Sequence, residues 1–232
     1  MKTLIKICVF LFVGLVSAQE KNQSVTNNTE QVFGRASNAG LSSYGTSSYF
    51  YNPKRLVEGS EFLFHTWKNH AVIHTKSNHK FLLTNINLLI PKNSFASKIS
   101  KDSIYLFDMN TIEKVVVNGK TYKMISSIEG ERIYQIIYTR KDFTILKGFK
   151  TKTILGSDNP MINRKTDKIV KKEYHYILRG EELLRFKLKK SNVLKLLNKE
   201  KQQLVKDYAK KHKLSFKKEF DLQKILNYYS CL

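Results

Sequence analysis

The pattern of hydrophobic and polar positions divides most of this chain into three regions. Residues 19–60 are rich in Asn, Ser, Thr and Gly and have almost no hydrophobic periodicity. From 61 to 190 apolar and polar residues alternate, which is typical of half-buried β-strands. From 191 to 232 apolar residues recur every three to four positions, which is typical of amphipathic helices. We therefore expect a polar leader, a β domain and a helical cap, in that order.

The alternating region predicts about ten short strands joined by short turns. Asn118-Gly119 is the strongest turn signal, because both residues tolerate positive φ. We also expect hairpins around Lys68-Asn69 and around residues 179–181, and a bulge or bend at Gly148. The strands are expected at residues 61–67, 71–76, 80–90, 112–117, 120–125, 132–139, 143–147, 149–155, 171–178 and 183–188.

Helices are expected at the end of the chain. Ser191 can cap a short first helix, and the apolar stripes at 200–212 and 217–229 predict two more. The predicted fold class is α+β, mainly β: an antiparallel meander sheet that curls into a barrel-like or sandwich form, with a C-terminal cap of two to three short helices.

The two regions before residue 61 differ from this domain. Residues 1–18 have the layout of a secretory signal peptide, with Lys2 and Lys6 before an apolar run and Val16-Ser17-Ala18 at the cleavage point. We expect export to the periplasm or cell envelope, or secretion, and no transmembrane span in the mature chain. The leader 19–60 should be largely disordered, with its aromatic end docked on the domain.

The charge balance is strongly basic. The formal net charge is +22, and loss of Lys2 and Lys6 with the signal peptide lowers it to about +20. Of the 41 basic residues, 34 are Lys, which supplies charge without the planar fork of Arg. This favours attraction to anionic envelope polymer or lipid headgroups and argues against nucleic acid. A solvated basic surface with no partner remains the alternative.

The basic residues are concentrated toward the C-terminus, where 13 Lys and four acidic residues lie between Lys187 and Leu232. Three of these lysines precede the first predicted helix, and three recur at helical spacing. The candidate residues for binding an anionic surface are Lys187, Lys189, Lys190, Lys206, Lys210 and Lys213.

Histidines cluster near the start of the β domain. A two-residue turn at Lys68-Asn69 would place His65, His70 and His74 on one face, whereas a three-residue turn would separate them. They are weak candidates for metal ligands, because no acidic or cysteine ligand stands near them. Ordinary strand and turn histidines are the alternative, and no sequence feature indicates a cofactor.

Catalytic signatures are missing from the sequence. There is no G-x-S-x-G elbow, P-loop, dinucleotide-binding fingerprint or EF-hand loop. Cys231 is the one cysteine after residue 18, and either a spectator thiol or an intermolecular disulfide fits it. We expect a non-enzymatic structural or binding module, with an envelope carbohydrate hydrolase or a metal-dependent enzyme as the alternative. The sequence does not indicate an oligomeric state.

Several segments carry a family resemblance. They are GSEFLFHTWKNHAVIH at 59–74, TNINL at 84–88, IYQIIY at 133–138, YHYIL at 174–178 before FKLKKSNVLKLL, and KDYAKKHKLSFKKEFDLQKILNYYS at 206–230. In these the chain resembles uncharacterised exported proteins of Bacteroidetes-type bacteria, over residues 59–230. The resemblance implies export and a sheet followed by helices, and it transfers no functional residue.

Overall fold

A computed structural model describes residues 45–50, 57–128, 130–157 and 166–232. The strands are β1 Gly45–Phe50, β2 Val57–Glu58, β3 Lys68–Thr75, β4 Lys80–Leu89, β5 Ser94–Lys98, β6 Ser103–Phe107, β7 Ile112–Val117, β8 Lys120–Ser127, β9 Gly130–Thr139, β10 Thr144–Ile154, β11 Asp167–Arg179 and β12 Glu182–Arg185. The helices are α2 Lys190–Leu194, the 3₁₀ turn η3 Lys199–Lys201, α3 Gln202–Lys211 and α4 Glu219–Ser230. The predicted signal peptide lies outside the described residues.

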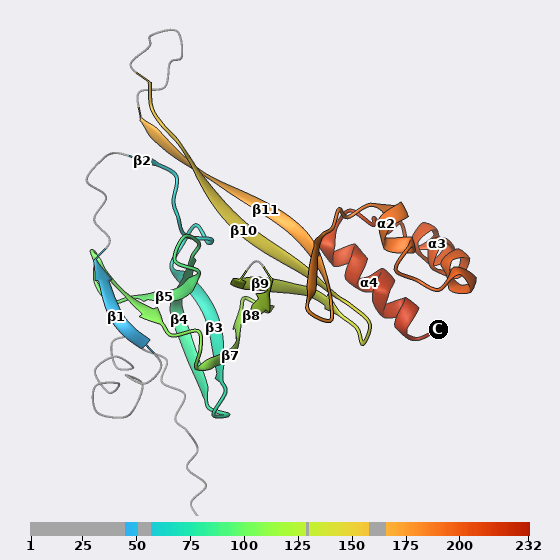
Figure 1. The fold of residues 1–232 in the computed structure, drawn as a ribbon, viewed down its shortest axis with the longest axis horizontal. Coiled ribbons are helices and arrows are strands. Elements are labelled where there is room, and N and C mark those ends of the chain that lie inside the picture. Colours follow the sequence, from blue (N-terminus) through green and yellow to red (C-terminus); the bar gives the residue numbers. More distant parts are fainter. Residues whose placement is uncertain (1–44, 51–56, 129, 158–165) are drawn as a thin grey trace, which may run out of the picture.

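One large sheet dominates the fold, with the helices gathered at one end of it (Figure 1). The strand order is β1-β6-β5-β4-β3-β7-β8-β9-β10-β11-β12, with every neighbouring pair antiparallel. β2 pairs in parallel with β11. The predicted class, α+β and mainly β with short C-terminal helices, is confirmed. β1 comes from the segment predicted as a polar leader and pairs with β6 at the sheet edge.

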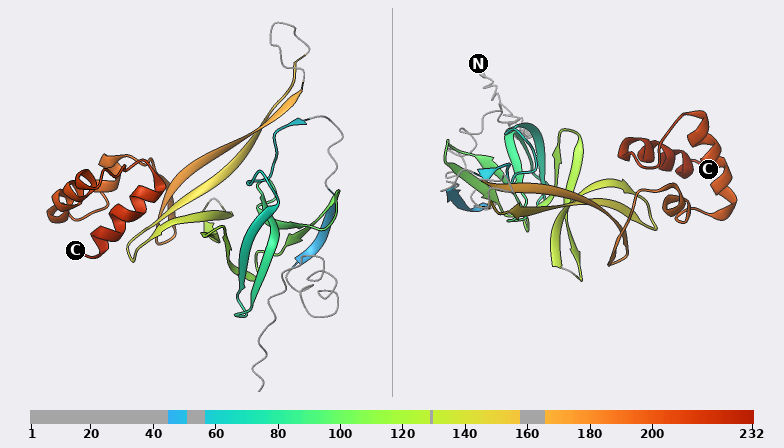
Figure 2. Two further views of the ribbon diagram at one scale, coloured as in Figure 1. Left: turned by 180° about the vertical axis from the view of Figure 1, so that it is seen from behind. Right: turned by 90° about the horizontal axis from the view of Figure 1, so that it is seen from above.

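The sheet bends but does not close into a barrel. β4 pairs with β3 through residues 80–85 and with β5 through 86–89, and β9 changes partner from β8 to β10 at Gln135. Because of these changes of partner, the strands in different parts of the sheet run in different directions (Figure 2). The sheet stays open because the first and last strands of this order, β1 and β12, do not pair with each other in the described part of the chain.

Each half of the sheet has its own apolar core. The first packs side chains of β3 to β9, among them Ile86, Phe95 and Val115, which are fully buried. The second packs β9 to β11 against the helices, with Ile145, Leu222 and Ile225 equally buried. The β10–β11 hairpin belongs to both, since Ile145 lies in the second core and Phe149 in the first.

The predicted hairpin between residues 61–67 and 71–76 is wrong. Lys68 and Asn69 are not a turn but the start of β3, which pairs with β4 and β7. Residues 61–67 instead run beside the second half of β4 and form one bridge, between Phe62 and Leu89. The buried amide of Asn69 donates to the carbonyls of Thr66 and Ile86 and so ties this segment to β4.

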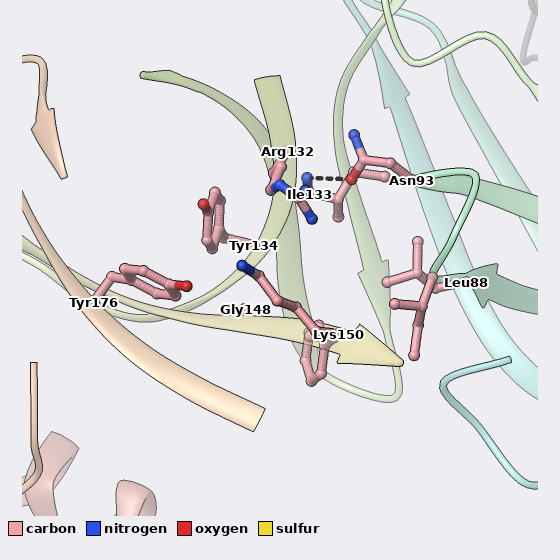
Figure 3. Close-up of a pocket in the computed structure, with 10 residues that line it drawn as sticks. Leu88, Asn93, Arg132, Ile133, Tyr134, Gly148, Lys150 and Tyr176 are labelled. Atoms are coloured by element: carbon pink, nitrogen blue, oxygen red, sulfur yellow. Dashed lines mark hydrogen bonds between the residues drawn. The ribbon is translucent and has the colours of Figure 1, made fainter. Parts of the chain in front are cut away.

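The prediction of a bulge or bend at Gly148 is also wrong, because β10 runs through it without a break. Glycine is required there for space. A Cβ at position 148 would lie 2.8 Å from Cε1 of Tyr134 and 3.1 Å from Cε2 of Tyr176. Figure 3 shows both tyrosines beside Gly148, at a pocket of about 10 Å³, which has room for at most about one water molecule.

The bulge lies in the neighbouring strand. Tyr138 pairs with Ile145 and Ile136 pairs with Leu146, which leaves Ile137 of β9 without a cross-strand partner. The Ile137 carbonyl instead accepts a hydrogen bond of 2.7 Å from Nε2 of Gln223 on α4. The bulge is therefore one of the points where the helical cap is fixed to the sheet.

The three predicted helices are present with shifted ends. α2 begins at Lys190 after Lys189, without a side-chain cap, so the expected cap by Ser191 is wrong. The second helix is preceded by the 3₁₀ turn η3, and the third begins at Glu219 and ends at Ser230. β5 and β6, with five residues each, were missed because their alternation is too short to stand out.

We predict that Gly148→Ala lowers the free energy of unfolding by about 1–3 kcal/mol, because the added methyl group overpacks two buried tyrosine rings. Urea denaturation measures the change. Lys152→Ala, at an exposed position of the same strand, is the control and should stay within about 0.5 kcal/mol of the parent. Equal stability of all three proteins would contradict the steric argument.

Candidate functional site

A charged cluster joins the helical cap to the sheet. Nζ of Lys147 lies 2.6 Å from Oε2 of Glu173 and 3.1 Å from Oε1 of Glu219, the first residue of α4. Nε2 of His175 donates to the same Oε1 of Glu219 at 2.7 Å. Lys147 and His175 are directly paired across β10 and β11. The side chain of Lys147 is 11% exposed, so its charge depends on these carboxylates.

The pKa values of this cluster are shifted in the direction that keeps it ionised. Burial tends to raise the pKa of Glu219, but the hydrogen bond from His175 and the charge of Lys147 outweigh it and hold that pKa below its usual value. Burial likewise tends to lower the pKa of Lys147, and the hydrogen bond and charge of Glu173 and Glu219 raise it overall. The cluster is therefore a stable ion network.

A broad groove of about 1460 Å³, here called the sheet groove, lies between strands β7 to β11 and the start of α4. Its polar lining includes the amides of Asn118, Gln135, Gln223 and Asn227. Glu219 is the acidic residue of this lining in the described part of the chain. The lysines of the sheet groove are Lys114, Lys120, Lys123, Lys147, Lys217 and Lys218.

A second groove of about 680 Å³, here called the helix groove, runs along α3 and the segment that leads to α4. Its floor includes the buried Ala209 and Phe216. Asp207 is the acidic residue of its described lining, beside Gln203 and Ser215. The lysines of the helix groove are Lys190, Lys206, Lys210, Lys213 and Lys217.

Four of the six lysines predicted from the sequence therefore line one groove. Lys206 and Lys210 project from α3, and Lys213 follows it with a positive φ of 52°. Lys190, the first residue of α2, lines the same groove. Lys187 and Lys189 are exposed residues before α2 and do not belong to the described lining of either groove.

Lys217 and the whole sheet groove were not predicted from the sequence. One sequence signal for the sheet groove was available. The predicted hairpin at Asn118-Gly119 pairs Val115 with Tyr122, and this register puts Lys114 and Lys123 next to each other on the opposite face. The approach of α4 to these strands, in contrast, depends on tertiary packing and has no local signal.

The three candidate metal ligands do not converge. His70 and His74 lie on the same, less buried face of β3, and His65 is exposed in the segment before it. Burial and the charges of Lys114 and Lys80 lower the pKa of His74. Within the described ranges, no group of three or more His, Cys, Asp or Glu is placed to hold a metal ion. Cys231 is an exposed free thiol.

No protein-family model, no curated protein and no solved structure matches this chain. Among the helices that the structure describes, none is long and apolar enough to cross a membrane.

We predict that Glu219→Gln lowers the free energy of unfolding by about 1–3 kcal/mol, because the buried ammonium of Lys147 loses one of its two carboxylates. Glu173→Gln is the matched control. Its side chain is 53% exposed, so water can replace it, and the loss should stay below about 1 kcal/mol. Urea denaturation of both variants checks the order, which would be reversed if Glu173 were the main partner.

The lowered pKa of Glu219 also predicts a pH dependence. Its carboxylate stabilises the fold at pH values above the unfolded pKa of 4.5, and this contribution is lost as the pH falls through the lower, folded pKa. The free energy of unfolding should therefore decrease below about pH 4.5, and the decrease should be shallower in Glu219→Gln. Parallel curves for the two proteins would show that Glu219 does not take part.

Proposed function

We propose that this chain is an exported, non-enzymatic binding module of a bacterial cell envelope, which attaches to an anionic envelope component through the helix groove. One observation carries the proposal: lysines from α2, from α3 and from the segment before α4 line the same concave surface. Positive charge gathered in a recess attracts anions more strongly than the same charge spread over a convex surface. Export rests on the sequence of residues 1–18 and on the family resemblance.

The charge of the helix groove is available to a ligand. Lys210, Lys213 and Lys217 are exposed, and in the described part of the chain no carboxylate lies within 4 Å of their ammonium groups. Lysine provides charge with little geometric selectivity, so the binding should be reversible and sensitive to salt.

A carbohydrate hydrolase is the alternative that we considered. Its general acid would need a carboxyl group with a raised pKa in a cleft. Glu219 is the carboxyl group on the described wall of the sheet groove, and its pKa is lowered by His175 and Lys147 against the effect of burial. This pKa shift argues against Glu219 as a general acid, so we favour binding over hydrolysis.

We predict that joint replacement of Lys206, Lys210 and Lys213 by Gln weakens binding to polygalacturonate, a linear polyanion, by at least about tenfold at low salt. Each lysine near an anionic surface contributes on the order of 1 kcal/mol. Isothermal titration calorimetry measures the affinity. Binding by the parent protein should be largely lost at about 0.5 M salt, where exposed charges are screened.

The matched control replaces Lys76, Lys80 and Lys101 by Gln, three exposed lysines outside the described lining of both grooves. This control variant loses the same charge and should bind within about threefold of the parent. Equal weakening in the two variants would show that net charge alone governs the interaction, and the proposal would fail.

A further inference from the structure

Lys217 lines both the helix groove and the sheet groove, so both grooves border the segment between α3 and α4. We propose that they form one continuous track that binds a single linear anionic polysaccharide. This inference rests on the proposed function and adds the chemical class and the extended shape of the ligand.

The sheet groove carries positive charge that the protein does not neutralise. The ammonium of Lys147 is paired with carboxylates of the ion network, and Nζ of Lys123 lies 3.4 Å from Oε1 of Glu113. For Lys114, Lys120 and Lys218 the described residues supply no carboxylate within 4 Å. In the proposed track, these unpaired lysines of the sheet groove follow the lysines of the helix groove.

The shape of the two grooves favours a chain over a membrane. Their lysines line recesses of about 1460 Å³ and 680 Å³ rather than one flat face. A bilayer surface is flat over the width of a protein and would meet the rims of the grooves. A single polymer strand can lie along the floor and approach lysines on both sides.

The lining favours a polysaccharide over a nucleic acid. The exposed amide of Asn227 suits sugar hydroxyls, as does the amide oxygen of Gln223, and Thr121 and Thr144 add hydroxyl groups. The described lining of either groove contains no Arg, the side chain with the planar fork for phosphate.

Single-stranded nucleic acids bind to a series of open aromatic faces, whereas the described lining of the two grooves offers one exposed aromatic ring, that of Phe220. The hydroxyl of Tyr138 donates to the carbonyl of Leu226 and the residue is buried. The exposed ring of Phe220 is covered on one side by the ammonium of Lys224, 4.4 Å from the ring centre.

A ligand that occupies both grooves gains affinity from the linkage, because binding in the second groove follows at high effective concentration. The gain in affinity from linkage therefore distinguishes one continuous track from two independent sites. With independent sites, a protein that has lost one groove still binds at the other, so at least one groove variant keeps nearly the parent affinity. With one track, damage to either groove weakens binding.

The experiment titrates polygalacturonate into four proteins by calorimetry at low salt. These are the parent, the helix-groove variant with Gln at positions 206, 210 and 213, a sheet-groove variant with Lys114, Lys120 and Lys218 replaced by Gln, and the control variant with Gln at 76, 80 and 101. Each variant changes three lysines, and circular dichroism verifies that each one is folded. We expect both groove variants to bind at least about tenfold more weakly and the control within about threefold.

The outcomes separate this inference from the proposed function. If the helix-groove variant alone weakens binding, the continuous track is overturned and the proposed function stands. If the sheet-groove variant alone weakens binding, the continuous track and the proposed function are both overturned. Both are also overturned if neither groove variant differs from the control. Co-sedimentation with phosphatidylglycerol vesicles is the second arm. Vesicle binding that exceeds polymer binding and needs the same lysines would assign the surface to a membrane and overturn the polysaccharide.

Discussion

Lys147 places a positive charge in the middle of a buried strand face, and the junction between sheet and helices is organised around its neutralisation. Its neighbours on that face are Ile145 and Phe149, which belong to the two separate cores. An unpaired ammonium at this position would be prohibitively costly. Glu173 comes from the neighbouring strand and Glu219 from the first turn of α4, so the docked helix supplies the second of the two carboxylates.

The same junction supplies further polar contacts between the cap and the sheet. Gln223 satisfies the carbonyl that the bulge at Ile137 leaves unpaired, and the hydroxyl of Tyr138 bonds to the carbonyl of Leu226. Polar contacts of this kind select one orientation of α4, whereas apolar packing alone tolerates small shifts. Because the first turn of α4 is held in this way, Lys217 and Lys218 lie at the wall of the sheet groove.

Elements with local signals were predictable from the sequence. Asn118 and Gly119 adopt positive φ in a turn that no β-branched residue would favour, and the hairpin forms where expected. The helical stripes around Leu222 and Ile225 were equally readable. The hairpin predicted before residue 76 failed because the buried Asn69, bonded to the carbonyl of Thr66 and to that of the distant Ile86, overrides local turn preference.

The class of fold, the excess of lysine and the group of lysines on α3 were all readable from the sequence, because these follow from composition and from periodicity within one element. The tertiary structure was needed to show that Lys190 joins Lys206 and Lys210, and that Lys217 lines two grooves. These residues meet because α4 docks on β10 and β11 and thereby fixes the segment before it. That docking brings Glu219 to Lys147, from which it is separated by 72 positions along the chain. No local sequence pattern indicates a pairing at that separation, so it can be seen only in the folded structure.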